Sequence, residues 1–218
     1  MKIFLDTASM DEIKHIEKWG IIDGITTNQK IFLNEKGVNF TDRVKEICDL
    51  MGNRPVSVES NEKSLDEMIN DGKNFSKIAP NVIVKVPMTK DGTGLEAVKI
   101  LAEEGIKINV TVMMNFNQLM LATKAGASYV SLFFNRSKDS GEDAVSIVKN
   151  IVNWINLYNY KTELIVGSIR HPDDVYQVAI YGAHIITIPY KIVLEMPYHK
   201  KTEETIEEFD KAWNDFNS

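Results

Sequence analysis

The sequence predicts an α/β fold in which eight strand–helix units close into a (β/α)₈ TIM barrel, with one additional helix at the C-terminus. Three observations predict it. Short runs of branched apolar residues alternate with longer helical patterns along all 218 residues, which is typical of a parallel sheet. The runs have the apolar character of strands buried on both faces. About eight such units, roughly 27 residues each, fit a barrel on the small side of the usual ~250 residues.

The strands are expected at the short apolar runs. In chain order these are Lys2–Leu5, Ile22–Ile25, Pro55–Val58, Val82–Val86, Ile106–Thr111, Tyr129–Phe133, Glu163–Gly167 and His184–Ile188. An open doubly wound sheet is the alternative topology. No GxGxxG motif follows the first strand, so the dinucleotide-binding form of that alternative loses its main support.

Signals for helix ends fall between these runs. Ser9 to Glu12 and Ser64 to Glu67 each have the spacing of a capping box. Pro172 suits the first position of a helix. Helix C-caps favour glycine, and three glycines precede strands in that position: Gly105, Gly126 and Gly182. In the tail, apolar residues at helical spacing predict a last helix at about 202–216, so residues 1–218 are expected to form a single domain.

Composition excludes several classes of protein. The net charge is −6 and the chain has one cysteine, Cys48, so neither a basic nucleic-acid surface nor a disulfide or multi-cysteine metal site is expected. The four histidines lack the HxH or HExxH spacing of a metal site. No apolar run approaches the ~20 residues of a membrane span, and Asp6 comes too early for a signal peptide. We expect a soluble, cytoplasmic protein with no nucleic-acid, membrane or metal partner.

Polar residues follow nearly every predicted strand. In a TIM barrel the carboxyl ends of the strands carry the chemistry, and capping does not require a polar group at nearly every strand. Taken singly, an Asp or Ser here is typical of a helix cap, and an Arg of a solvated surface. The polar positions are Asp6, Thr26 to Asn28, Glu59, Lys85, Asn109 to Thr111, Ser131 with Arg136, and Ser168 to Arg170.

Lys85 is the most specific of these residues. It interrupts the apolar run VIVKVP, although lysine is almost never fully buried without a partner. One interpretation is a structural ion pair with Asp6 or Glu59. The other is a Schiff-base lysine: apolar walls disfavour the ammonium form, so a neutral amine becomes available to attack a ketone. The resulting iminium is an electron sink that lets the neighbouring carbon–carbon bond break.

Such chemistry needs proton carriers near the amine. Asp6 or Glu59 would take the proton from the substrate hydroxyl as the bond breaks. Glu59 with Thr111 would hold the water that carries protons during imine formation.

The remaining polar residues suit a phosphorylated sugar. The amides of Asn28 and Asn109 would orient sugar hydroxyls. Arg136 and Arg170, with Ser168, would form a site for a phosphate or another dianion.

Several motifs occur in an order and spacing that together are specific. They are FLDTA at 4–8, GITTN at 24–28, VSVE at 56–59, VIVKVPMT at 82–89, EGIKINVT at 104–111, YVS at 129–131 and GSIRHP at 167–172. Over essentially its whole length the chain resembles the small transaldolase family, which includes transaldolase-like proteins and fructose-6-phosphate aldolase.

The resemblance implies a role for each site residue. Lys85 would form the Schiff base, Asp6 would act on the substrate hydroxyl, and Glu59 with Thr111 would hold the catalytic water. The implied reaction moves a dihydroxyacetone unit between sugar phosphates, as when fructose 6-phosphate and erythrose 4-phosphate give sedoheptulose 7-phosphate and glyceraldehyde 3-phosphate. No metal or organic cofactor is implied, and small members form pentamers or decamers. The implied substrate contacts are Asn28, Asn109, Ser131 and Phe133 for the sugar, and Arg136, Ser168 and Arg170 for its phosphate.

Two residues favour one branch of the family. Glu59 and Phe133 resemble the transaldolases, whereas the aldolase branch tends to have Gln and Tyr, respectively. A free-standing aldolase that releases dihydroxyacetone is therefore the second hypothesis.

Two loops depart from the family pattern. Gln29 and Lys30 replace Pro and Ser or Thr after TTN, and Ser131 to Arg136 reads SLFFNR instead of SPFVGR, with Leu132 for Pro and Asn135 for Gly. These changes support a third hypothesis, a non-catalytic sugar-phosphate-binding barrel.

Overall fold

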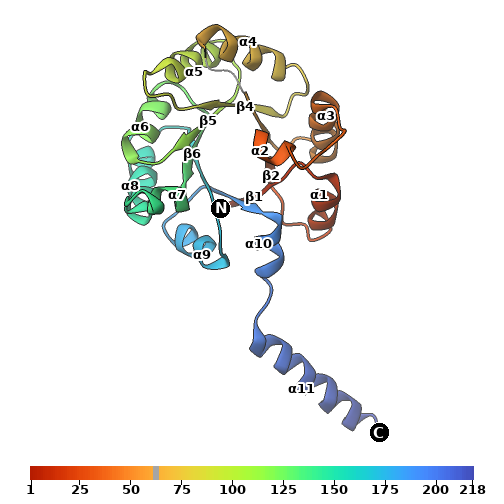
Figure 1. The fold of residues 1–218 in the computed structure, drawn as a ribbon. Coiled ribbons are helices and arrows are strands. Elements are labelled where there is room, and N and C mark those ends of the chain that lie inside the picture. The colour runs from red at the N-terminus through yellow and green to blue at the C-terminus, as the bar shows by residue number, and fades with distance from the viewer. Residues whose placement is uncertain (61–63) are drawn as a thin grey trace.

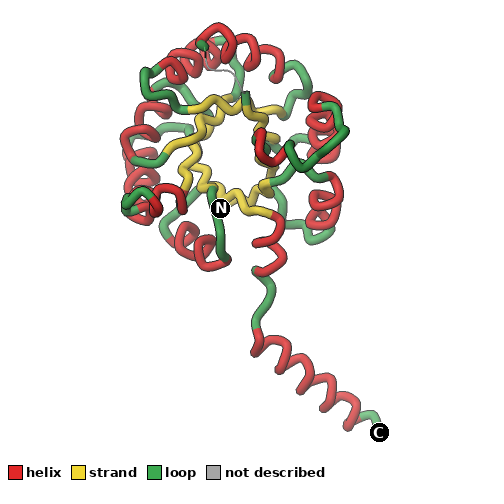
Figure 2. The backbone as a smooth tube through the Cα atoms, viewed as in Figure 1, coloured by secondary structure: helices red, strands yellow, loops and turns green. Residues whose placement is uncertain are grey.

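Eight parallel strands close into a barrel in chain order, β1 to β8, with β8 paired to β1. The computed structural model describes residues 1–60 and 64–218. Figure 1 shows the strands as an inner ring and most helices around it, and Figure 2 shows the same two layers by element type. The strands are β1 (Lys2–Asp6), β2 (Gly24–Thr26), β3 (Val56–Glu59), β4 (Val82–Pro87), β5 (Ile108–Met113), β6 (Tyr129–Phe133), β7 (Glu163–Gly167) and β8 (Ile185–Pro189).

All eight predicted strands are confirmed, and the closed barrel excludes the open doubly wound sheet. The helices that precede the last one are α1 (Met10–Glu17), α2 (Gln29–Phe32), α3 (Phe40–Met51), α4 (Leu65–Phe75), α5 (Thr93–Glu103), α6 (Phe116–Lys124), α7 (Phe134–Asp139), α8 (Ala144–Leu157), α9 (Pro172–Ile180) and α10 (Tyr190–Glu195).

The predicted helix signals are confirmed, with one difference. Ser64 and Glu67 form a complete capping box at α4, and Pro172 opens α9. At α1, Ser9 Oγ accepts from the Glu12 N–H, but the Glu12 carboxylate accepts from Thr7 Oγ1 instead of returning to the helix start. The three glycines predicted at helix ends all have positive φ, where an L side chain is strained.

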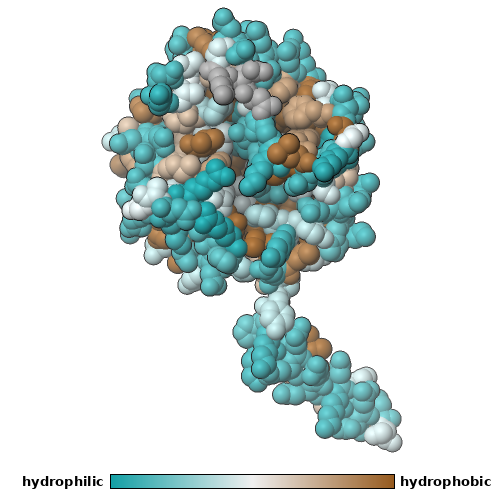
Figure 3. Space-filling view, viewed as in Figure 1, coloured by the Kyte–Doolittle hydropathy of each residue, from teal (hydrophilic) through white to brown (hydrophobic). Residues whose placement is uncertain are grey.

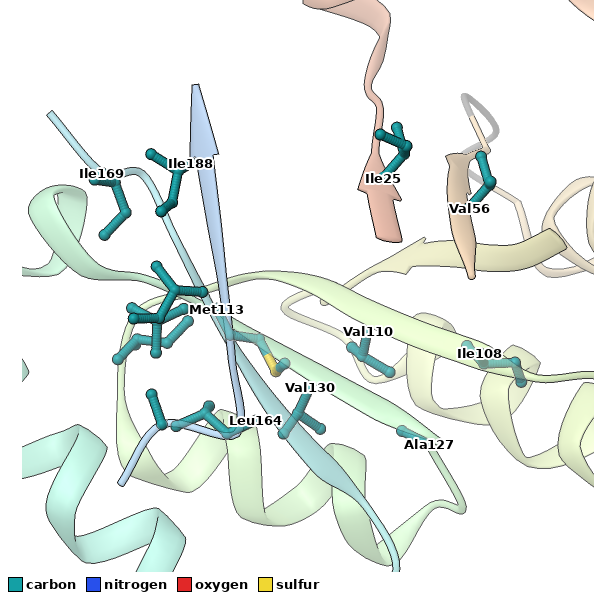
Figure 4. Close-up of a cluster of buried hydrophobic side chains, with 14 of the residues drawn as sticks. Ile25, Val56, Ile108, Val110, Met113, Ala127, Val130, Leu164, Ile169 and Ile188 are labelled. Carbon is teal, nitrogen blue, oxygen red and sulfur yellow. The ribbon is translucent and has the colours of Figure 1, made fainter. Parts of the chain in front are cut away.

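The strands alternate between two environments. Branched side chains on the outer face of the barrel pack beneath the helices and form the main core, part of which Figure 4 shows. Val110, Val130 and Leu164 belong to this face and come from neighbouring strands. Residues one step along each strand point into the barrel instead. The outward-facing residues of each strand thus form the apolar core under the helices, and the inward-facing residues that alternate with them can be polar.

The inner face has an apolar lower layer. Phe4 packs with Ile165 and Ile185, apart from the main core, and all three are almost fully buried. A Cβ on Gly24 would lie 2.6 Å from the Phe4 ring, so the ring occupies the space that a side chain at position 24 would need. This layer closes the barrel below the polar side chains that face its carboxyl end.

The last helix, α11 (Lys200–Phe216), extends away from the barrel. It starts two residues before the predicted boundary of about 202. Figures 1 and 3 show it as an arm joined to the barrel by a narrow segment, and none of its residues is buried against the described part of the chain. No helix among the described residues is long and apolar enough to span a membrane.

Candidate active site

A pocket of about 110 Å³ opens at the carboxyl ends of the strands. All of the predicted site residues except Glu59, Asn109 and Arg170 line it. The lining residues are Asp6, Thr26, Asn28, Lys85, Thr111, Ser131, Phe133, Arg136, Gly167, Ser168 and Thr187.

Lys85 projects from β4 into the pocket wall and is only 5% exposed. Its Nζ donates to the Thr27 carbonyl oxygen at 2.9 Å and lies 3.0 Å from Glu59 Oε2. Glu59 is its register partner on β3. The ion pair weighed for this residue therefore exists, and it holds the amine at the pocket rather than in solvent.

The expectation of an apolar wall around this amine is wrong. Val84 and Val86 belong to the core beneath the helices, because alternate strand residues point to opposite faces. The amine itself contacts a carboxylate and a carbonyl. Of these two partners, the Glu59 carboxylate can take a proton from the amine, and the Thr27 carbonyl oxygen can only accept a hydrogen bond.

Asp6, at the end of β1, is the second acidic group facing Lys85. Burial raises the pKa of its carboxyl above the usual value, and the charge of Glu59 adds to the rise. The charge of Lys85 and a hydrogen bond from Thr26 oppose it. Thr26 Oγ1 donates to Asp6 Oδ1 at 2.6 Å, and Thr187 Oγ1 lies 2.5 Å from Thr26 Oγ1. A carboxyl with a raised pKa is better able to give back a proton that it has accepted.

Thr111 contributes a buried hydroxyl to the pocket. It is fully buried and lines the pocket, yet its Oγ1 has no hydrogen-bond partner within residues 1–60 and 64–218. The next residue, Val112, has φ of +62°, which is unusual for a β-branched residue. The β5–β6 register also shifts here. Such irregularities re-aim side chains near active sites.

Asn109 lies behind the pocket rather than on its surface. It is fully buried, its Oδ1 accepts from Ser131 Oγ at 2.6 Å, and its Nδ2 donates to Ser57 Oγ at 3.3 Å. Ser131 does line the pocket. In this arrangement Asn109 orients the Ser131 hydroxyl.

Asn28 has a structural role as well as a place on the pocket. Its side chain caps α2 by accepting from the Ile31 N–H at 3.0 Å. The carboxamide nitrogen is thus the group that Asn28 can offer a ligand.

The opposite side of the pocket is cationic. Arg136, in α7, lies over the Phe133 ring with its guanidinium carbon 4.9 Å from the ring centre. Such stacking holds a guanidinium while leaving its N–H groups available. Ser168, just after β7, has φ of +60°, a conformation that costs a non-glycine residue of order 1 kcal/mol and is common at ligand sites.

Arg170 is not on the pocket surface. Its Nη1 and Nη2 donate to the two carboxylate oxygens of Asp139 at 3.0 and 2.5 Å, and both side chains are about half exposed. The predicted pairing of two free arginines is therefore incomplete: Arg136 is available, whereas Arg170 is engaged at the rim.

The departures from the family pattern have structural explanations. Gln29 Nε2 donates to the Ser60 carbonyl oxygen at 3.0 Å, which ties α2 to the end of β3. Lys30 is exposed, as a solvated lysine would be. Asn135 is buried and donates to Ser168 and Asp174.

Sequence reasoning missed Thr187 and Gly167 on the pocket, and gave no role to Thr26. A threonine within the apolar run IITIP of β8 was the one signal for Thr187. The described residues contain no group of three or more His, Cys, Asp and Glu side chains arranged to hold a metal ion.

The arrangement combines a buried amine, two carboxylates, a buried hydroxyl that is unpaired among the described residues, and a cationic edge. These groups can form an imine with a carbonyl compound, move its protons and hold an anion.

Comparisons with known proteins identify the relatives of this chain. Residues 3–218 match the family model described as transaldolase/fructose-6-phosphate aldolase. A "Probable transaldolase" of Exiguobacterium sp. (strain AT1b) is 44% identical over the full length of both chains. One of Geobacillus thermodenitrificans is 43% identical over 98% of this chain and 99% of its own.

The comparison with solved structures supports the fold alone. The crystal structure of a 3-hexulose-6-phosphate synthase matches with a TM-score of 0.62 over 87% of this chain and 90% of its own, at 14% identity. The match of the family model over nearly the whole chain, with the relatives aligned end to end, shows that this chain belongs to the transaldolase/fructose-6-phosphate aldolase family.

Proposed function

We propose that this chain is a class I transaldolase. It would move a dihydroxyacetone unit from fructose 6-phosphate or sedoheptulose 7-phosphate to an aldose phosphate, in the cytoplasmic pentose phosphate pathway. The observation that carries the proposal is the buried Lys85 amine at the pocket wall, 3.0 Å from Glu59 and facing Asp6. The family and the names of the relatives support it.

The chemistry begins at Lys85. After its ammonium passes a proton to Glu59, Nζ attacks the C2 carbonyl of the ketose, and loss of water from the adduct gives an iminium. Glu59 returns the proton to the departing hydroxyl. The water that carries protons in this step would be held by Glu59 and by Thr111, whose hydroxyl has no competing partner among the described residues.

Asp6 acts in the next step. It accepts the proton of the C4 hydroxyl while the C3–C4 bond breaks and the electron pair moves into the iminium. The first aldose phosphate leaves as an aldehyde, and an enamine stays on Lys85. The enamine carbon then attacks the acceptor aldehyde, Asp6 returns the proton to the new hydroxyl, and hydrolysis of the iminium frees Lys85. The raised pKa of Asp6 suits this two-way role.

Substrate binding uses the rest of the pocket. Asn28 and Ser131 would contact the dihydroxyacetone hydroxyls, with Asn109 orienting Ser131. Arg136 and Ser168 would bind the phosphate, and Arg170 would join them by exchanging Asp139 for the phosphate.

Acceptor dependence tests the proposal against the aldolase of the same family. Glu59 and Phe133 favour transfer, so fructose 6-phosphate should be consumed with erythrose 4-phosphate present and barely without it. Equal cleavage without the acceptor, with release of dihydroxyacetone, would identify a fructose-6-phosphate aldolase. Tight binding of fructose 6-phosphate with neither turnover nor a covalent adduct would identify a non-catalytic sugar-phosphate binder. Lys85→Met is the control for background cleavage.

We infer that α11 docks on another copy of this chain. Its apolar residues repeat at helical spacing and are 54–78% exposed: Ile206, Phe209, Trp213 and Phe216. Most of the stability of a helix in a protein comes from packing its apolar face against other structure, but α11 buries nothing against the described part of its own chain. A homo-oligomer, a pentamer or decamer by resemblance, would cover this face.

Light scattering during size-exclusion chromatography tests the assembly. Phe209→Ser with Trp213→Ser should lower the measured mass toward the 24.7 kDa monomer, whereas Asp210→Asn on the same helix should leave it unchanged. A parent that elutes as a monomer at micromolar concentration would contradict the inference.

A further inference from the structure

Asn135 joins two segments at the cationic edge of the pocket. It is the second residue of α7, directly before Arg136, and is 7% exposed. Its Nδ2 donates to the Ser168 carbonyl oxygen at 2.8 Å and to Asp174 Oδ2 at 2.7 Å. One carboxamide thus links α7 to the loop between β7 and α9, a sequence distance of more than thirty residues.

Asp174 collects further bonds from the same loop. Its Oδ2 also accepts from the backbone N–H groups of Arg170 and His171, at 2.9 and 3.0 Å. The side chain is 5% exposed, and Lys138 Nζ lies 3.9 Å from its other oxygen. Three N–H groups and the Lys138 charge therefore offset the negative charge of this carboxylate, which weakens its repulsion of a nearby anion.

The two segments so joined carry the groups assigned above to the phosphate. Ser168 has the left-handed φ of +60°, which its surroundings must enforce. The bond from Asn135 fixes the peptide on its carboxyl side. Arg136 follows Asn135 in α7, and its guanidinium rests on Phe133. Both lining residues therefore share one buried anchor.

We propose that Asn135, braced by Asp174, is a positioning residue that presets Ser168 and Arg136 for the phosphate of the sugar substrate. The proposal rests on the proposed function for the identity of that anion. Glycine, which occupies this position in the SPFVGR pattern that the chain resembles, has no side chain to make these bonds. These two hydrogen bonds are therefore a feature of this sequence that the SPFVGR pattern does not supply.

Asn135→Ala removes both donated bonds and keeps a helix-forming residue in α7. The KM for fructose 6-phosphate should rise about tenfold with kcat within twofold, because a positioning bond is lost without any change at Lys85. The Kd for inorganic phosphate, measured by calorimetry, should rise by a similar factor. Asn150→Ala, the same change on the exposed part of α8, should leave both constants unchanged.

Unphosphorylated dihydroxyacetone separates positioning from a general loss of structure. Its borohydride-trapped adduct on Lys85 should form at the parental rate in Asn135→Ala. If trapping of dihydroxyacetone fell as much as binding of fructose 6-phosphate, the proposal would be contradicted. A Kd for phosphate and a KM for fructose 6-phosphate within twofold of the parental values would also contradict it. If the parent forms no adduct at all, the proposed function fails, while the calorimetric Kd for phosphate still tests the role of Asn135.

Discussion

Replacing Thr111 with Val should stabilise the protein and slow its reaction. The hydroxyl is fully buried and unpaired among the described residues. A buried hydroxyl without a protein partner costs about 1–3 kcal/mol. A bound water offsets part of this cost but loses entropy when it is held in place, and Val replaces the hydroxyl with a methyl group of similar size. Each kcal/mol shifts Tm by about 2–4 °C in a domain of this length, so we expect a rise of several degrees. The loss of a proton-relay contact should lower kcat about 100-fold or more.

Thermal unfolding and a coupled assay of sugar-phosphate transfer measure the two effects on one preparation. Thr162→Val is the matched control, because Thr162 is also buried but donates to the Ala127 carbonyl oxygen at 2.7 Å. That variant should lose about 1 kcal/mol and keep its activity. A Thr111→Val protein that is less stable than the parent, or equally active, would refute the reasoning.

Three further predictions concern the charged groups. Asp6→Asn removes a buried carboxyl whose pKa is higher in the folded than in the unfolded protein, where it is 3.8. Because of this difference, the parent loses stability as the pH rises above 3.8. Calorimetric scans should therefore give the variant a higher Tm than the parent near pH 7.5, no difference below pH ~4 and no turnover; a lower Tm at pH 7.5 would contradict this. Glu59→Gln removes the charge opposite Lys85 and should raise the share of free dihydroxyacetone released relative to transfer; an unchanged share would count against its role. Asp139→Asn frees Arg170 and should lower the KM for fructose 6-phosphate about two- to fivefold, the range of an exposed ion pair; an unchanged KM would place Arg170 outside the phosphate site.

The barrel was predictable because its strands are marked by local sequence. Each strand is an apolar run, and runs such as Glu163–Gly167 match the observed bounds. The pocket followed from topology, since parallel strands bring their carboxyl ends to one rim. Asp6, Lys85 and Ser131 therefore meet although they are far apart in the chain.

Side-chain partners were harder to predict, because they depend on which groups meet across loops. The position of Arg170 in the sequence does not show that Asp139 engages it. Asn109 occupies a strand end, yet Ser57 and Ser131 satisfy it behind the pocket. The sequence identified Asn135 only as a departure from the SPFVGR pattern. Its hydrogen bond to Asp174 depends on the path of two loops, which the sequence does not show.

The surroundings of Lys85, the proposed Schiff-base residue, were also not predictable from the sequence. Its apolar neighbours in sequence predicted an apolar setting, but strand alternation turns them to the other face. The amine meets Glu59 and the Thr27 carbonyl instead. Its reactivity would thus depend on proton exchange with carboxylates more than on an apolar wall.

The most direct test is to identify the residue that binds the substrate covalently. The protein is reduced with borohydride in the presence of fructose 6-phosphate, digested and analysed by peptide mass spectrometry. The account predicts a three-carbon adduct on Lys85 and none in Lys85→Met. A saturated enzyme with an unmodified Lys85, or an adduct on the exposed Lys30 instead, would contradict it.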